Sequence, residues 1–96
     1  LRIGSGAWDA LMDRRADPAV IAGIAEIVRD WPGVHGFHDL KTRTAGSRVF
    51  VNIHIELDGD QSLREAHAIG AALRSAIVAA YPQADVIIHK DVARLT

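Results

Sequence analysis

The stretch from residue 48 to residue 57 reads RVFVNIHIEL, and its alternating pattern is the clearest strand signal in the chain. Hydrophobic side chains at every second position are typical of a β-strand with one covered face. The covered face is predicted to hold Val49, Val51, Ile53, Ile55 and Leu57. The other face is predicted to hold Phe50, Asn52, His54 and Glu56. Such a strand needs further strands beside it and helices over its hydrophobic face.

The segments on either side of this strand predict those neighbours. Ala45-Gly46-Ser47 is turn chemistry, so residues 34–44 are expected to form a hairpin with residues 48–57. After the loop at Asp58-Gly59-Asp60, a helix is predicted from about residue 62 to residue 80, and a third strand from 84 to 91. The helix carries a hydrophobic stripe of Ala66, Ile69, Gly70, Leu73, Ile77 and Ala80.

An earlier helix is indicated by Asp17-Pro18, which supplies an N-cap and a proline at the first helical position. Pro32-Gly33 is expected to stop it. Residues 1–7 are interpreted as a flexible lead, and residues 7–14 as a short helical piece. One domain is therefore expected over residues 8–92, followed by a frayed tail at 93–96.

The predicted element order is α-β-β-α-β, which places the chain in the α+β class. A right-handed crossover through the second helix makes the second and third strands parallel neighbours. The result is a three-stranded mixed sheet with two helices on one face. The other face then carries the polar and histidine positions.

Composition excludes several classes of protein. The 96 residues are 49% hydrophobic, enough for a core, and include no cysteine, so disulfides and thiolate zinc sites are excluded. The net charge of −1 and 5% aromatic content argue against a nucleic-acid partner. No apolar run of about 18 residues predicts a membrane span, and no signal peptide is visible.

Histidine is the unusual feature, because the chain has five copies. His89 and Asp91 are two residues apart on one strand, so they share a face. Parallel pairing would bring them together with His54. His38 joins them if the hairpin turn is centred near Gly46, whereas a turn of even length would break that register. Imidazoles and a carboxylate together are good zinc ligands.

Each of these residues also has an ordinary interpretation. A single histidine on a sheet face is usually solvated or hydrogen-bonded, and Asp91 could simply cap its strand. His67 lies at the edge of a hydrophobic stripe, where it could flank the sheet or face a second copy of the chain. His35 is expected to be an exposed loop residue outside the cluster. No nucleophile beside a base and no phosphate loop is visible, so no enzyme is expected.

An ordered set of motifs resembles the cation diffusion facilitator family, most of all its bacterial ferrous-iron and zinc efflux members. The similarity covers about residues 8–91. It consists of Leu11-Met12-Asp13-Arg14, Trp31-Pro32-Gly33-Val34, Gly36-Phe37-His38-Asp39-Leu40, Thr42-Arg43, Ile53-His54-Ile55-Glu56, Glu65-Ala66-His67 and Asp85-Val86-Ile87-Ile88-His89-Lys90-Asp91.

This resemblance implies a ferredoxin-like, metallochaperone-like cytoplasmic domain that forms a homodimer. It would be attached to the cytoplasmic side of a transmembrane domain of six helices in the cell membrane. That transmembrane domain would exchange metal for protons. The resemblance implies metal ligands at His38, His54, His89 and Asp91, with the carboxylate bridging two ions, and at His67 from the neighbouring subunit. Asp13 matches an acidic residue that forms salt bridges at the junction with the membrane domain.

The expected function is therefore regulation of a divalent-metal efflux transporter by metal bound between two copies. Zn²⁺ is the first expectation, and Fe²⁺, Cd²⁺, Co²⁺, Ni²⁺ and Mn²⁺ remain alternatives, because affinity order alone does not select a metal. A free-standing metal carrier or storage protein is the alternative of another class. A metal hydrolase ranks below both, because Glu56 is the one acid near His54 and is interpreted as solvated.

Overall fold

The computed structural model describes residues 15–93. Along the chain, the elements are α2 (Pro18–Arg29), β1 (Gly36–Ala45), β2 (Arg48–Leu57), α3 (Leu63–Ala80) and β3 (Ala84–Val92). This order confirms the predicted α-β-β-α-β arrangement. The expected lead at 1–7, the short helix at 7–14 with Asp13, and tail residues 94–96 lie outside the described residues. Ala93, the first residue of that tail, is buried and donates its N–H to the Leu57 carbonyl at 2.7 Å.

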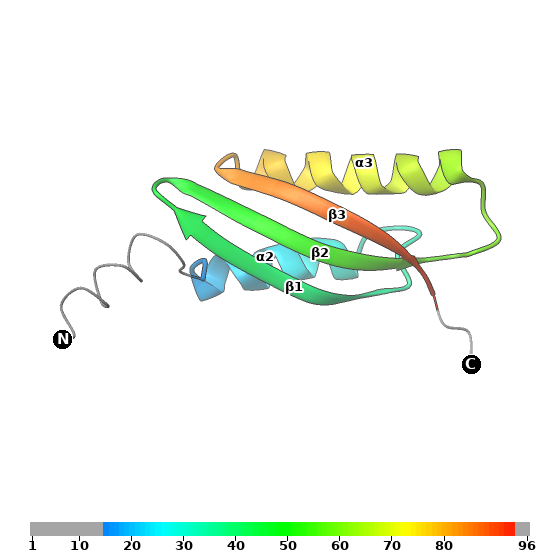
Figure 1. The fold of residues 1–96 in the computed structure, drawn as a ribbon, viewed down its shortest axis with the longest axis horizontal. Helices are drawn as coiled ribbons and strands as arrows, with labels where there is room; N and C mark the ends of the chain where they lie inside the picture. Colours follow the sequence, from blue (N-terminus) through cyan, green and yellow to red (C-terminus); the bar gives the residue numbers. More distant parts are fainter. Residues whose placement is uncertain (1–14, 94–96) are drawn as a thin grey trace.

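The three strands form one mixed sheet in the order β1-β2-β3. β1 and β2 are antiparallel, and β2 and β3 are parallel, as the crossover rule predicted. In Figure 1, α2 lies behind β1 and β2, and α3 runs along β3, so the helices leave one face of the sheet open. Within residues 15–93, no helix is long and apolar enough to cross a bilayer.

The helix starts follow from short-range hydrogen bonds. The Asp17 side chain accepts from the Ala19 N–H at 2.9 Å, with Pro18 at the first helical position. Ser62 and Glu65 form a reciprocal capping box at the start of α3, with bonds of 3.0 and 2.9 Å. These caps satisfy N–H groups that have no partner inside the helix.

The core lies between the helices and the covered face of the sheet. The predicted covered face of β2 is buried along its whole length. It packs against the buried residues of the two helices, which are Ile24, Val28, Gly70, Leu73 and Ile77. Ala80, expected in the α3 stripe, is the last residue of α3 and is exposed. The open face is therefore free to carry polar side chains.

A bulge in β1 sets the register that matters for function. Ala45 pairs with Arg48 across a two-residue turn, so an uninterrupted ladder would place His38 opposite Ile55, facing the core. Instead, the register shifts between His38 and Lys41, and His38 pairs with His54. A turn of even length was expected to break this pairing. The extra residue of the bulge restores it.

Asp39, inside the bulge, has a left-handed backbone with φ 53°, which costs a β-branched residue more than glycine. We expect Asp39→Val to lower the free energy of unfolding by about 1–2 kcal/mol, and Asp39→Gly to leave it unchanged or raised. Urea unfolding measures both. Lys41→Val, at a regular exposed position of the same strand, is the control and should cost nothing. Equal stability of the two Asp39 variants would contradict this account of the bulge.

Candidate metal centre

Three histidines lie side by side on the open face, one from each strand. His38 pairs with His54 across β1 and β2, and His54 pairs with His89 across β2 and β3. The rings of His38 and His54 stack with centroids 5.1 Å apart, and those of His54 and His89 with centroids 4.3 Å apart. Strand register thus converts three distant sequence positions into one row of imidazoles.

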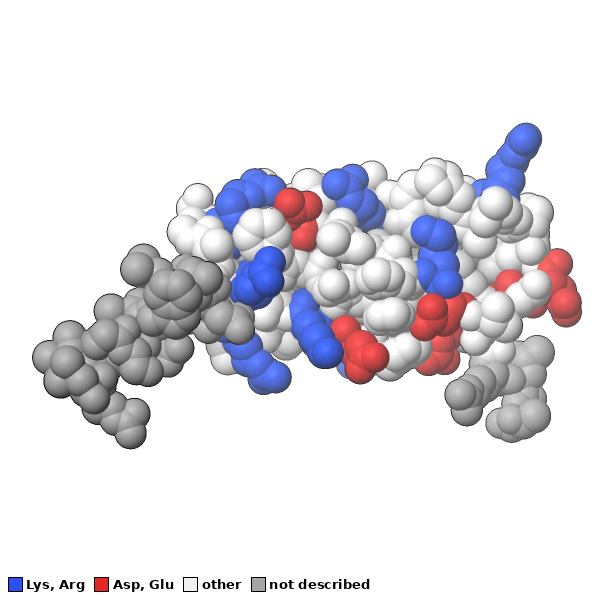
Figure 2. Space-filling view, in the orientation of Figure 1, with Lys and Arg blue, Asp and Glu red and all other residues white. Residues whose placement is uncertain are grey.

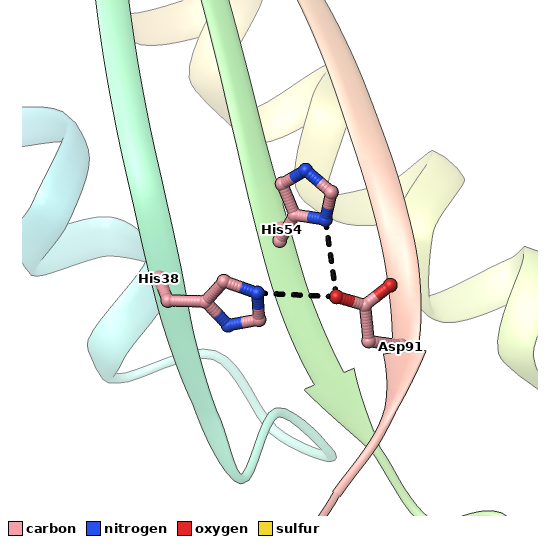
Figure 3. Close-up of side chains that lie close together, drawn as sticks. All are labelled: His38, His54 and Asp91. Atoms are coloured by element: carbon pink, nitrogen blue, oxygen red, sulfur yellow. Dashed lines mark hydrogen bonds and ion pairs between the residues drawn. The ribbon is translucent and has the colours of Figure 1, made fainter.

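Asp91, near the end of β3, lies beside this row of histidines. One carboxylate oxygen, Oδ2, lies 3.2 Å from His38 Nε2 and 3.0 Å from His54 Nδ1. Figure 3 shows the two rings, from β1 and β2, pointing at the same oxygen. All three side chains are partly exposed, at 43% for His38, 34% for His54 and 39% for Asp91. The group is therefore held by protein contacts and is still reachable from solvent.

The donor set of His38, His54 and Asp91 fits a divalent metal ion. Their ligand atoms all lie within 4.8 Å of one another. In a tetrahedral site with bonds of about 2.1 Å, ligand atoms stand about 3.4 Å apart. The separations of 3.0 and 3.2 Å are close to that value. Two imidazoles and one carboxylate would leave a fourth position for water or another ligand.

His89 is beside this group but does not join it in this arrangement. Its Nε2 donates to Asn52 Oδ1 at 2.7 Å, and its ring stacks on His54. The hydrogen bond to Asn52 leaves Nδ1 as the unprotonated ring nitrogen. The expected role of His89 as a ligand stays a prediction.

The remaining two histidines lie elsewhere. His67 is exposed on α3, which packs on the covered face of the sheet, so it is not brought together with the open-face group. His35 is exposed ahead of β1, and its backbone N–H donates to the Glu56 carbonyl at 2.9 Å. The structure therefore unites three of the five expected ligands, and places His35 outside the group as the sequence analysis expected.

Glu56 has a contact that the sequence analysis missed. Interpreted there as solvated, its side chain is 32% exposed and its Oε2 lies 2.9 Å from His38 Nδ1. Register could have indicated this contact, because Glu56 lies diagonally across from His38 once His54 pairs with it. The expected pairing of His38 with His54 already implied this diagonal, and the bulge is what produces that pairing in the structure.

Charge is unevenly distributed over this face. In Figure 2, most blue side chains lie toward the β1–β2 hairpin, and most red side chains lie toward the end where β3 finishes. The acidic residues around that end are Glu56, Asp58, Asp60 and Asp91, and the basic residues near the hairpin include Lys41, Arg43 and Arg48. A local excess of negative charge raises the local concentration of cations.

Comparison with known proteins decides the family. Residues 16–92 match the family described as the cytoplasmic domain of cation efflux proteins. The chain belongs to the cation diffusion facilitator family. This family consists of cation transporters and is not a class of enzymes, and the resemblance stated from the sequence motifs is confirmed.

Curated members of the family extend well beyond this chain. The cation-efflux pumps FieF of Salmonella arizonae and Salmonella typhi are each 42% identical to it over 91 residues. The match covers 95% of this chain but 30% of each FieF sequence. The chain therefore spans under a third of the length of these cation diffusion facilitator pumps.

Solved structures share the fold. CzrB, a candidate zinc transporter, is 30% identical, with a TM-score of 0.76 over 81% of this chain and 98% of its own. The nickel form of a MamM C-terminal-domain variant is 24% identical, with a TM-score of 0.75 over 81% of this chain and all of its own. These likenesses confirm the expected cytoplasmic-domain fold of the cation diffusion facilitators.

Proposed function

We propose that this chain is the metal-sensing domain of a divalent-metal efflux transporter. Two copies pair, zinc binds at the open sheet face, and the tighter dimer favours transport by the membrane domain of the same protein. The observation that carries this proposal is the convergence of His38 and His54 on one Asp91 oxygen. Membership of the cation efflux family supports it. The proposed bounds of this domain are residues 8–92.

Zinc is the proposed ion because of the donor chemistry. Two imidazole nitrogens and a carboxylate oxygen form the donor set of many zinc sites. The same ligands accept Fe²⁺, Co²⁺, Ni²⁺ and Cd²⁺, and with lower affinity Mn²⁺. Likeness to CzrB, a candidate zinc transporter, supports zinc as the first ion to test.

The proposed full ligand set adds His89 and a residue from a second copy. His89 stacks on His54 beside Asp91, so a rotation of its ring away from Asn52 would let it bind a second ion bridged by the Asp91 carboxylate. His67 is exposed on the helix side of its own domain. A ligand role for His67 therefore requires that it act on the site of a partner subunit.

Linkage explains how metal would act on the dimer. A ligand stabilises whichever state binds it, by about 2.7 kcal/mol when its concentration is 100 times its dissociation constant. Acidic residues near the end of β3 repel one another when two copies approach, and bound cations neutralise that charge. Metal therefore shifts the dimer toward a closed state without any chemical reaction.

The test is a distance measured between two subunits. The chain has no cysteine, so Ser75→Cys on the exposed surface of α3 gives one label per subunit. We expect a dimer at micromolar concentration, and a shorter and narrower label-to-label distance once zinc is added. His67→Ala should keep zinc binding at the sheet-face group and lose most of the shortening.

His35→Ala is the matched control, because it also removes an exposed histidine but lies outside the proposed site. It should behave like the parent protein in both sedimentation and distance. A strict monomer with and without zinc, or a distance that zinc does not change, would overturn the proposed function.

A further inference from the structure

The carboxylate of Glu56 contacts the side of His38 that faces away from Asp91. Glu56 Oε2 lies 2.9 Å from His38 Nδ1, while His38 Nε2 lies 3.2 Å from Asp91 Oδ2. We propose that Glu56 is a positioning residue, which fixes His38 as the Nδ1–H tautomer so that the lone pair of Nε2 is directed at the metal. This inference rests on the proposed function, since it concerns the same site.

The strands are shaped to allow this contact. Gly36 pairs directly with Glu56 across the β1–β2 ladder. A Cβ atom at position 36 would lie 3.3 Å from Glu56 Oε1, closer than side chains ordinarily pack. Because glycine has no side chain, position 36 leaves room for the Glu56 carboxylate to extend along β1 toward His38. The β1 bulge is the second feature that allows the contact, because it places His38 on the same face of the sheet as Glu56.

The tautomer has a chemical consequence for the site. When Nδ1–H donates to Glu56, Nε2 carries a lone pair and no proton. Nε2 and the Asp91 oxygen are then two acceptors facing each other at 3.2 Å, an arrangement that is favourable when a cation lies between them. A carboxylate behind a metal-binding histidine also holds the ring in one orientation. Glu56 would therefore prepare the site without touching the ion.

The experiment has two readouts on the whole chain, one of which needs no metal. Nitrogen-15 NMR of the metal-free protein at pH 8 reports which ring nitrogen of His38 carries the proton. Calorimetry with zinc chloride then gives the affinity. The variants are Glu56→Ala, which removes the acceptor, and Glu56→Gln, whose amide oxygen can still accept from Nδ1–H. Asp85→Ala is the control, because it removes an exposed carboxylate from the same sheet face, opposite Phe50.

We expect the parent protein, Glu56→Gln and Asp85→Ala to show the Nδ1–H form of His38, and Glu56→Ala to lose it. Zinc affinity should fall 10- to 100-fold in Glu56→Ala, as for other residues that orient a metal ligand. It should fall less than about tenfold in Glu56→Gln, and stay at the parent value in Asp85→Ala.

Three results would overturn the role of Glu56. The first is an Nε2–H form of His38 in the parent protein, and the second is an unchanged tautomer of His38 in Glu56→Ala. The third is a loss of zinc affinity in Glu56→Gln as large as in Glu56→Ala, which would mark Glu56 as a direct ligand. The first needs no variant, so it holds even if Glu56→Ala does not fold. Failure of the parent protein to bind zinc would instead overturn the proposed function.

Discussion

Replacing Asp91 with alanine should lower zinc affinity by more than about 100-fold, because residues that merely orient a ligand already cost 10- to 100-fold. The reason is geometric, since a single Asp91 oxygen serves both His38 and His54. Its removal also takes away the negative charge that offsets the ion. Isothermal calorimetry gives both the affinity and the number of ions per subunit.

Two further variants separate charge from position at this residue. Asp91→Asn keeps an oxygen near the same place and loses the charge, so its affinity should lie between those of the parent and Asp91→Ala. Asp85→Ala removes a carboxylate from the same strand away from the histidines, and should bind zinc normally. Parent-like affinity and stoichiometry in Asp91→Ala would show that the ion binds elsewhere.

Lowering the pH from 7.5 to 5.5 should weaken zinc binding by roughly 100-fold. Histidine must be neutral to bind a metal, and a free histidine titrates near about pH 6.5. Over this interval a free imidazole goes from about nine-tenths neutral to about one-tenth neutral, and the group contains two histidines, His38 and His54. Zinc affinity must fall as the pH falls, because protons compete with the ion for the histidine nitrogens.

The pH experiment needs a check that the protein itself is intact. Circular dichroism at both pH values should show the same secondary structure, so that the loss belongs to the site. His35→Ala should show the same pH dependence as the parent, because His35 lies outside the group. Equal zinc affinities at the two pH values would count against histidine ligation.

Most of the fold could be predicted because its signals are local. The alternation of residues 48–57 matched the observed bounds of β2, Arg48–Leu57. The predicted N-cap at Asp17 and the helix start predicted near residue 62 agree with the observed starts of α2 and α3. The parallel pairing of β2 and β3 followed from the handedness of crossovers, so the convergence of His54 with Asp91 was also within reach.

What the sequence could not supply depends on single residues of the β1 ladder. Whether His38 faces the core or the open sheet depends on one extra residue, and no periodicity reveals a bulge centred on Asp39. The contact between Glu56 and His38 depends on the same register. The hydrogen bond from His89 to Asn52 depends on rotamers, which strand alternation does not determine.

We propose that zinc lies between His38, His54 and Asp91 on the open sheet face. The most direct test is a crystal of the domain grown with zinc, with anomalous diffraction recorded on both sides of the zinc absorption edge. We expect a peak at roughly 2.0–2.2 Å from His38 Nε2, His54 Nδ1 and an Asp91 carboxylate oxygen. Zinc peaks at His35 or elsewhere, with none at these three residues, would contradict it.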